Sequence, residues 1–429
     1  VMSSNRDFVR ISSLSGRDLI FRRLSNKFAG PPAFRTPRVT RWCDVQYYTE
    51  SLAPLPSPSR PPHLFPSLRS TMFRGYSFLA LSLLSTSRRA AVAFAPSTRS
   101  ASLRRFGVSK LGSTSDDDFA GFSSEVAFMF PGQGAQFVGM CGSLAAEVPA
   151  AAALFAEASS ILGYDLLARC TEGPKELLDS TEVSQPAIFV ASMAAVEKLR
   201  ASEGGDAAVA AATCAMGLSL GEYSALCFAD AISFADGVRI TKARGEAMQA
   251  AADAADSSMV SVIGLPKEQV AELCAAASER SGENVRIANY LCAGNYAVSG
   301  ASKACDAVEE IAKPEFKARM TVRLAVAGAF HTDFMQPAVG ALEEVLAGVE
   351  IKKPRIPVVS NVDARPHSDP AVIKKLLATQ VTAPVLWENT MDSVLGSGFE
   401  RAVELGPGKV TAGILKRFNK KAQVENIQV

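Results

Sequence analysis

The chain has 429 residues, of which 48% are hydrophobic and 21% are charged, so it is long enough for two or three globular domains. The formal net charge of +2 conceals an asymmetry, because residues 1–115 hold 18 basic and 4 acidic side chains whereas residues 116–429 hold 27 basic and 39 acidic ones. A basic N-terminal segment before an acidic body indicates a removable leader. The body has no lysine-rich run with interleaved aromatic residues, which argues against nucleic-acid binding.

Residues 1–71 have the composition of a segment without a packed core. Proline, serine and arginine cluster there, as in residues 54–62, and no hydrophobic period is sustained. We expect this stretch to be a non-structural upstream extension, with Met72 as the candidate initiator.

Residues 72–115 are expected to form a bipartite targeting leader. The apolar run Phe78–Leu84 is too short to span a bilayer and fits the core of a signal peptide, and residues 91–93 offer an A-x-A cleavage site. Residues 97–115 are rich in Ser, Arg and Ala and contain no acid, which is typical of transit peptides. This order resembles the leaders of plastids bounded by extra membranes and predicts delivery to the plastid (chloroplast) stroma. The alternative is a secreted protein with a disordered pro-region.

The body alternates buried strands and helices, which is typical of an α/β domain. We assign this core to residues 125–255 and 328–425. A short apolar run that meets Pro131-Gly132 predicts the first strand, and a second run leads into a tight turn and a helix from Glu222. The predicted strands are 126–130, 212–216, 356–360 and 401–406, with helices at about 139–160 and 185–202.

Residues 256–327 follow a different pattern. Strands are expected at 259–265, 285–290, 296–299 and 320–325, with helices at 267–277 and 303–313. This βαββαβ order is the ferredoxin-like unit. We therefore predict an α/β fold in which a small ferredoxin-like subdomain is inserted into a larger α/β domain, with a ligand cleft between the two.

Eight cysteines are scattered along the chain, and no pair has C-x-x-C spacing. Zinc and redox motifs are therefore unsupported, and no metal site is expected. The seven cysteines of the body lie in mostly apolar contexts, so we expect reduced core residues, which fit a reducing compartment better than secretion.

The run Gly217-Leu218-Ser219-Leu220-Gly221 is G-x-S-x-G between a predicted strand and a predicted helix. The turn is sharp, so the residues two before and two after the serine must be nearly without volume. The N–H groups that follow begin a helix and point to where an oxyanion would form. Ser219 is therefore the candidate nucleophile; the structural alternative is a serine that caps the helix.

A serine nucleophile needs a base, and the chain has three histidines. His63 lies in the expected leader, and His367 lies in a polar turn where a solvated role is expected. His331 follows the inserted unit and is the base by elimination, since an imidazole suits proton transfer at neutral pH. Many acidic residues lie between Ser219 and His331, but no motif identifies one of them as the third member of a catalytic triad. A backbone carbonyl can orient the imidazole ring instead.

Three more segments accompany the elbow and the histidine: residues 130–136 (FPGQGAQ), 244–249 (RGEAMQ) and 404–409 (ELGPGK). Together with residues 217–226 and 328–331, they resemble malonyl-CoA:acyl carrier protein transacylases over residues 126–417. The family's α/β-hydrolase-like core with a ferredoxin-like insert agrees with the fold predicted above.

The resemblance implies roles for individual residues. Ser219 and His331 would be catalytic, and the main-chain carbonyl of Gln380 would orient the histidine. The backbone N–H groups of Gln133 and Leu220 would form the oxyanion hole. The remaining implied substrate contacts are Arg244, which would clamp the malonyl carboxylate, and Met248, Asn289 and Phe330. Leu291 and Asn295 depart from the family pattern, so ligand roles are not expected there, and Phe330 favours malonyl over methylmalonyl.

The resemblance further implies malonyl transfer from malonyl-CoA to holo-acyl carrier protein, without a cofactor, for fatty acid synthesis. A serine hydrolase or thioesterase acting on acyl-CoA is the alternative, and a non-catalytic carrier-binding module is a second rival. We expect a monomer without a stable membrane span. Carrier proteins are usually acidic, so docking needs a local basic patch, for which the candidates are Lys409, Lys416, Arg417, Lys420 and Lys421.

Overall fold

The computed structural model describes residues 119–429. The predicted upstream extension (1–71) and the predicted leader (72–115) lie outside the described residues.

The larger part of the described chain is built on a sheet of five parallel strands in the order β7-β2-β1-β8-β9. These strands are β1 (Val126–Phe130), β2 (Cys214–Gly217), β7 (Val358–Val359), β8 (Arg401–Leu405) and β9 (Gln423–Ile427). The strands predicted near β1, β2 and β8 are confirmed, and the one predicted at 356–360 shrinks to β7. The sequence pattern does not predict β9, so the predicted core limit at residue 425 falls inside a strand.

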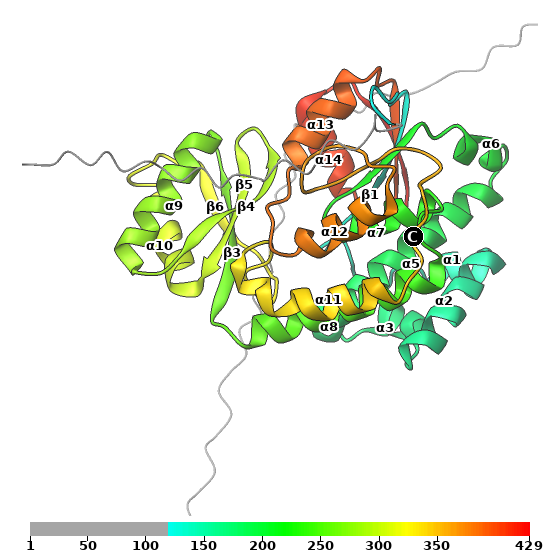
Figure 1. Cartoon of the computed structure of the whole chain (residues 1–429), viewed down its shortest axis with the longest axis horizontal. Helices are drawn as coiled ribbons and strands as arrows, with labels where there is room; N and C mark the ends of the chain where they lie inside the picture. The colour runs from blue at the N-terminus through cyan, green and yellow to red at the C-terminus, as the bar shows by residue number, and fades with distance from the viewer. Residues whose placement is uncertain (1–118) are drawn as a thin grey trace, which may run out of the picture. The chain divides into compact units, whose positions relative to one another are not determined.

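Helices cover both faces of this large sheet (Figure 1). Along β1, Phe128 and Phe130 belong to one hydrophobic cluster and Ala127 and Met129 to another, because successive side chains of a strand point to opposite faces. A parallel sheet buried on both faces needs apolar residues at every position, which explains the continuous apolar run. The first face packs against α5 (Thr181–Ala201), α7 (Gly221–Phe228) and α8 (Phe234–Asp253), and the second against α13 (Trp387–Gly396) and α14 (Val410–Phe418).

The other helices of this part of the chain surround these layers. They are α1 (Gly142–Glu147), α2 (Pro149–Leu162), α3 (Leu166–Glu172), α4 (Lys175–Asp179), α6 (Gly205–Ala210), α11 (Gln336–Ala347), α12 (Pro370–Gln380) and the 3₁₀ turn η1 (Asp333–Met335). The helical stretch predicted over about 139–160 is confirmed, but as two helices, because α1 ends before Val148 and α2 begins at Pro149. Val148 is extended, with φ −117° and ψ 101°, as expected of a residue that precedes proline.

The predicted ferredoxin-like subdomain is confirmed as a four-stranded antiparallel sheet in the order β4-β5-β3-β6. Its elements are β3 (Ser257–Ile263), α9 (Lys267–Ser281), β4 (Val285–Cys292), β5 (Asn295–Ala301), α10 (Ser302–Ala312) and β6 (Met320–Arg323). α9 and α10 pack on one face of this small sheet (Figure 1). Val260, Ile287 and Val298 are buried in the hydrophobic cluster between them and the sheet. The other face places Met259 and Ala297 in the hydrophobic cluster of the larger domain.

The cysteines within residues 119–429 are free thiols, and all are buried except the half-buried Cys227. In the same residues no single helix is long and apolar enough to cross a membrane, although the bent pair α2 and α3 passes that test by length and composition.

Candidate active site

Ser219 lies in the tight turn between β2 and α7. Its backbone φ is +51°, in the left-handed region that residues other than glycine seldom adopt. A Cβ on Gly217 would lie 1.9 Å from the carbonyl carbon of Gly221, and a Cβ on Gly221 would lie 2.3 Å from the carbonyl oxygen of Phe130. Glycine is therefore required at both ends of the motif, and the turn holds the serine at the carboxyl edge of the large sheet.

Asn361 holds this turn from a neighbouring segment. Its Oδ1 accepts the backbone N–H of Ser219 at 2.6 Å, and its Nδ2 donates to the carbonyl of Gly217 at 2.8 Å. The side chain thus bridges the two limbs of the strained turn, and the hydrogen bonds offset part of the strain. Sequence reasoning missed Asn361, because it lies more than 140 residues from the motif that it supports.

His331 faces the serine. Its Nε2 lies 2.8 Å from Ser219 Oγ, and its Nδ1 lies 2.8 Å from the main-chain carbonyl oxygen of Gln380. A carbonyl can only accept, so Nδ1 carries the proton and Nε2 is free to receive the serine proton. The ring is oriented by a carbonyl rather than by a carboxylate, the arrangement that the sequence left open.

The surroundings of His331 favour the neutral ring. The side chain is buried, and this burial lowers its pKa to about 4, with a further lowering from the positive charge of Arg244. The hydrogen bond to the Gln380 carbonyl opposes this shift and is the weaker effect. At neutral pH the imidazole is therefore unprotonated and able to act as a base.

Arg244 is a buried cation on α8 that makes no ion pair within residues 119–429. Its Nη1 donates to Gln185 Oε1 at 2.7 Å, and its Nη2 donates to Gln380 Oε1 at 2.9 Å and to Ser219 Oγ at 3.1 Å. Its Nε is buried without a partner among the same residues, and burial lowers the pKa of the guanidinium. A buried guanidinium held by amides beside the nucleophile is a receptor for a carboxylate.

Glu222 is the nearest acid behind this arrangement, and Gln380 separates it from Arg244. Gln380 Nε2 donates to Glu222 Oε2 at 2.6 Å and to the carbonyl of Ser219 at 3.0 Å, while the backbone N–H of Asn361 donates to Glu222 at 3.0 Å. Burial raises the pKa of Glu222 to about 7. Gln380 therefore contributes its side chain to the Arg244 network as well as its carbonyl to the histidine.

Ser219, His331 and Arg244 line a cavity of about 90 Å³ between the large and small sheets, whereas Glu222, Gln380 and Asn361 do not line it. The small sheet contributes Met259 and Asn289. From the larger domain come Gln133, Leu218, Ser219, Leu220, Arg244, Met248, Phe330 and His331. Within residues 119–429, the backbone N–H groups of Gln133 and Leu220 have no acceptor, and Asn289 Oδ1 is buried without a partner. The cavity thus offers polar groups that a ligand would satisfy.

The comparisons with known proteins agree with this geometry. Residues 127–429 match the acyl transferase domain family. The chain is 42% identical over 304 residues to the human mitochondrial malonyl-CoA-acyl carrier protein transacylase, covering 68% of this chain and 77% of that protein. It is 39% identical over 298 residues to the Bacillus subtilis malonyl CoA-acyl carrier protein transacylase, covering 70% and 92%. The chain belongs to the malonyl-CoA:acyl carrier protein transacylase family. Its fold matches the acyl carrier protein S-malonyltransferase of Vibrio cholerae with a TM-score of 0.65 and 36% identity, covering 71% of this chain and 97% of that one.

The remaining family motif, residues 404–409, has a structural role. Glu404 is fully buried, and its carboxylate accepts the backbone N–H and the hydroxyl of Thr411 and the backbone N–H of Ala412, so it caps α14. Gly406 has φ +132°, and a Cβ there would lie 2.9 Å from Pro131 Cγ. The motif therefore supports the loop that carries Gln133 instead of touching the cavity.

Two other sequence candidates lie apart from the site. His367 Nε2 is 2.8 Å from Asp363 Oδ2 in the polar turn where a solvated role is expected. Asn295 Oδ1 accepts the Ser261 hydroxyl at 3.0 Å. Neither residue lines the cavity, and no group of His, Cys, Asp or Glu within residues 119–429 has the arrangement of a metal site.

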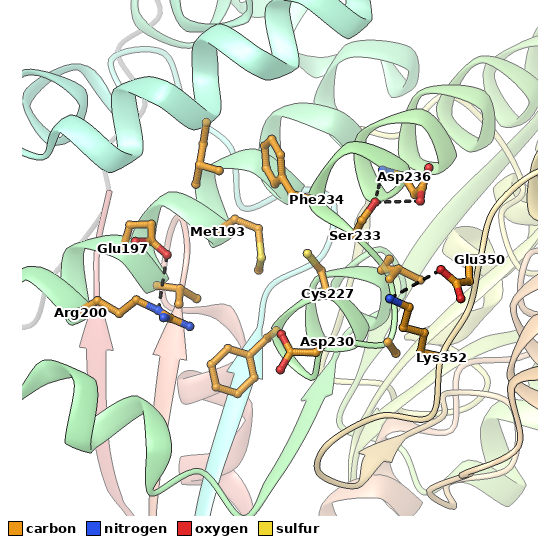
Figure 2. A pocket seen from close by; sticks show the side chains of 15 residues that line it. Met193, Glu197, Arg200, Cys227, Asp230, Ser233, Phe234, Asp236, Glu350 and Lys352 are labelled. Atoms are coloured by element: carbon orange, nitrogen blue, oxygen red, sulfur yellow. Dashed lines mark hydrogen bonds and ion pairs between the residues drawn. The ribbon is translucent and has the colours of Figure 1, made fainter.

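A larger cavity of about 330 Å³ lies where α5 and α7 end and α8 begins (Figure 2). Its charged side chains are in ion pairs: Arg200 with Glu197 and Lys352 with Glu350 inside the lining, and Asp230 and Asp236 with arginines outside it. It holds the thiol of Cys227, whose pKa burial raises to about 12, and no histidine lines it. This cavity has the larger volume, but the smaller one is the candidate active site because it contains Ser219, His331 and Arg244.

Proposed function

We propose that this chain transfers a malonyl group from malonyl-CoA to the phosphopantetheine thiol of acyl carrier protein, through a malonyl-Ser219 intermediate, for fatty acid synthesis. The observation that carries the proposal is the meeting of Ser219, His331 and Arg244 at one cavity. A nucleophile, a neutral base and an unpaired buried cation are the parts that transfer of an acid-bearing acyl group requires. Membership of the family supports the same reaction.

In the first step, His331 Nε2 takes the proton of Ser219 Oγ as that oxygen attacks the thioester carbonyl. The oxyanion is stabilised by the backbone N–H groups of Gln133 and Leu220. Collapse of the intermediate breaks the C–S bond, and coenzyme A leaves with the proton from His331. In the second step, His331 takes the proton of the carrier thiol, which attacks the carbonyl of malonyl-Ser219. The ester C–O bond then breaks, and Ser219 Oγ leaves with the proton from His331, which restores the hydroxyl. The proposed reaction needs no cofactor.

Arg244 and Phe330 set the acyl preference in this proposal. The planar fork of Arg244 binds the free carboxylate of malonate, so an acetyl group would leave the buried cation unpaired. Phe330 is buried and lines the cavity, so its ring crowds an α-methyl branch. Met248 and Asn289 complete the acyl pocket. Substitution Phe330→Ala is expected to raise the ratio of methylmalonyl to malonyl transfer, measured with the two thioesters in competition.

Intact-mass analysis tests the central proposal. Incubation of the protein with malonyl-CoA is expected to add one malonyl group to Ser219, and holo-acyl carrier protein is expected to remove it while gaining that mass. Ser219→Ala provides the control and is expected to remain unlabelled. Release of free malonate with no acyl carrier product would instead favour the hydrolase alternative, and labelling at another residue would contradict the assignment.

The carrier surface is proposed to include basic residues before, within and after α14. They are Lys409 just before the helix, Lys416 and Arg417 in its last turn, and Lys420 and Lys421 after it. α14 packs against β1 and β4, and Arg417 Nη1 lies 3.9 Å from Cys292 Sγ on β4. This helix therefore stands beside both walls of the cavity. A complex between a related malonyl transacylase and the holo carrier protein of a type II polyketide synthase matches this chain with a TM-score of 0.66 and 34% identity.

The body is proposed to act as a monomer in the stroma of a plastid bounded by extra membranes. Residues 72–115 are proposed to be the targeting leader that delivers it there. The support is the acid-poor, Ser- and Arg-rich composition after a short apolar run. Relatives include mitochondrial proteins, so the fluorescence of a C-terminally tagged full chain in an algal cell should coincide with chlorophyll, not with a mitochondrial dye. A variant without residues 72–115 should stay in the cytosol.

A further inference from the structure

Arg286 joins the small sheet to both segments that hold the catalytic histidine. It lies on β4, and its Nη2 donates to the carbonyl of Thr382 at 2.7 Å and reaches the carbonyl of His331 at 3.4 Å. The same nitrogen lies 3.4 Å from Asp333 Oδ1. One guanidinium therefore holds the backbone of the base and the backbone two residues after Gln380.

The His331 backbone needs such support. Its φ is +61°, a conformation that is strained for a residue with a side chain. On the inner side, His331 N donates to the Val381 carbonyl at 3.1 Å and the ring donates to the Gln380 carbonyl. Arg286 adds the contact on the outer side, so the two segments are fixed against each other from both directions.

Arg286 is also one of two arginines whose charge acts on the His331 ring. Arg244 faces His331 from α8 and Arg286 from β4, and both lower the pKa of the imidazole after burial itself. The acids nearby are Asp333 on the same segment as His331, which pairs with Arg286, and Glu222 on α7, which Gln380 separates from Arg244. α12 contributes the uncharged Gln380.

We propose that Arg286 is a positioning residue for the transfer reaction, which clamps the His331 segment and the end of α12 to the small sheet and so aligns the ring with Ser219. The proposal rests on the proposed function. It makes the small sheet part of the machinery that places the base, in addition to forming a wall of the cavity.

The test compares full-chain Arg286→Met, Arg286→Lys and the matched control Arg323→Met, which alters an arginine on β6 of the same sheet that pairs with Asp306 and Glu309. The rate of malonyl-Ser219 formation is measured from pH 3.5 to 8, which covers the pKa of His331 near 4, alongside that pKa by NMR. Arg286→Met is expected to slow acylation about tenfold through misalignment of the base. It should also raise the His331 pKa, and with it the pH at which acylation declines in acid, because a like charge is removed.

Arg286→Lys keeps the charge, but its shorter side chain ends before the position of Nη2, the nitrogen that makes all three contacts. It should therefore restore the pH profile and leave acylation slow, while Arg323→Met should match wild type in both. Arg286→Met with a wild-type rate, acid limb and NMR titration would overturn the proposal, even with a lowered melting temperature. If wild type itself forms no malonyl-Ser219, the proposed function fails, whereas normal acylation of wild type together with an unchanged rate and titration in Arg286→Met contradicts the present inference alone.

Discussion

At His331, burial and the charge of Arg244 act in the same direction, so the pKa of the base lies near 4 in place of 6.5. An imidazole with an unperturbed pKa would lose most of its base form by pH 5.5, and His331 would not. We therefore expect the rate constant of malonyl-Ser219 formation to stay nearly constant from pH 7 to pH 5.5. Rapid-quench measurements of acylation across this range check the expectation, and a half-maximal rate at pH 6.5 would contradict it.

Arg244 is the residue on which discrimination between malonyl and acetyl groups depends. Arg244→Ala removes the carboxylate receptor, so kcat/KM for malonyl-CoA is expected to fall by about 10²–10³-fold, because a charge-assisted bidentate contact is lost. Transfer of acetyl groups should fall far less, or rise. The two thioesters are compared in parallel, with Arg239→Ala as the control, since Arg239 lies on the same helix and pairs with Asp236 at the surface. An equal loss for both thioesters would assign Arg244 a structural role.

The residues found from sequence and those missed differ in kind. Ser219 lies in a local motif, and His331 is one of only three histidines, so a single sequence is enough to find both. Asn361, Glu222 and Gln185 act through hydrogen bonds to residues between about 59 and 158 positions away, and nothing near them in sequence marks that use. Gln380 was accessible only through its family resemblance, and its side-chain contacts with Arg244 and Glu222 appear only in three dimensions.

At the scale of elements, α14 connects the cavity to the proposed carrier surface. Lys416 lies exposed in its last turn, and no hydrogen bond or ion pair ties its side chain within residues 119–429. Lys416→Glu is expected to raise KM for acyl carrier protein several-fold by charge repulsion, and to leave acylation by malonyl-CoA unchanged. Steady-state kinetics at two salt concentrations check this, because the difference should shrink as salt rises. Lys313→Glu, on the small subdomain after α10, is the charge-matched control. An unchanged KM would remove α14 from the docking surface.

Elements with a clear hydrophobic periodicity or a tight turn could be predicted from the sequence. Elements whose limits depend on tertiary contacts could not. The βαββαβ order of the subdomain follows from alternating short runs, and each strand is found within a few residues of its expected place. The break between α1 and α2 depends on Pro149, which a proline rule would have located. β9 (Gln423–Ile427) has only two apolar residues, Val424 and Ile427, and becomes a strand because it pairs in parallel with the edge of β8.

At the scale of the whole molecule, two buried groups of the site link catalysis to stability. Between pH 4.5 and 7 the native state keeps a proton on Glu222 that the unfolded chain has lost, because burial raises the pKa of Glu222 to about 7. The free energy of unfolding should therefore fall as pH rises through that window. His331 has the opposite effect between about pH 4 and 6.5, where the unfolded chain binds the proton and the native state does not, so stability rises with pH.

Above pH 6.5 the Glu222 contribution is the larger of the two, because half of the His331 sites in the unfolded chain have already lost their proton at that pH. The free energy of unfolding is expected to fall by about 1 kcal/mol between pH 6.5 and pH 8 on its account. Glu222→Gln imitates the protonated carboxyl, so this variant should lose that part of the pH dependence while keeping the hydrogen bond that one oxygen accepts. Urea unfolding followed by circular dichroism at both pH values, on wild type and on Glu222→Gln, measures the difference. Equal pH dependence in the two proteins would mean that Glu222 is already ionised at pH 6.5, and the physical reason would then be that Asn361 and Gln380 compensate its burial.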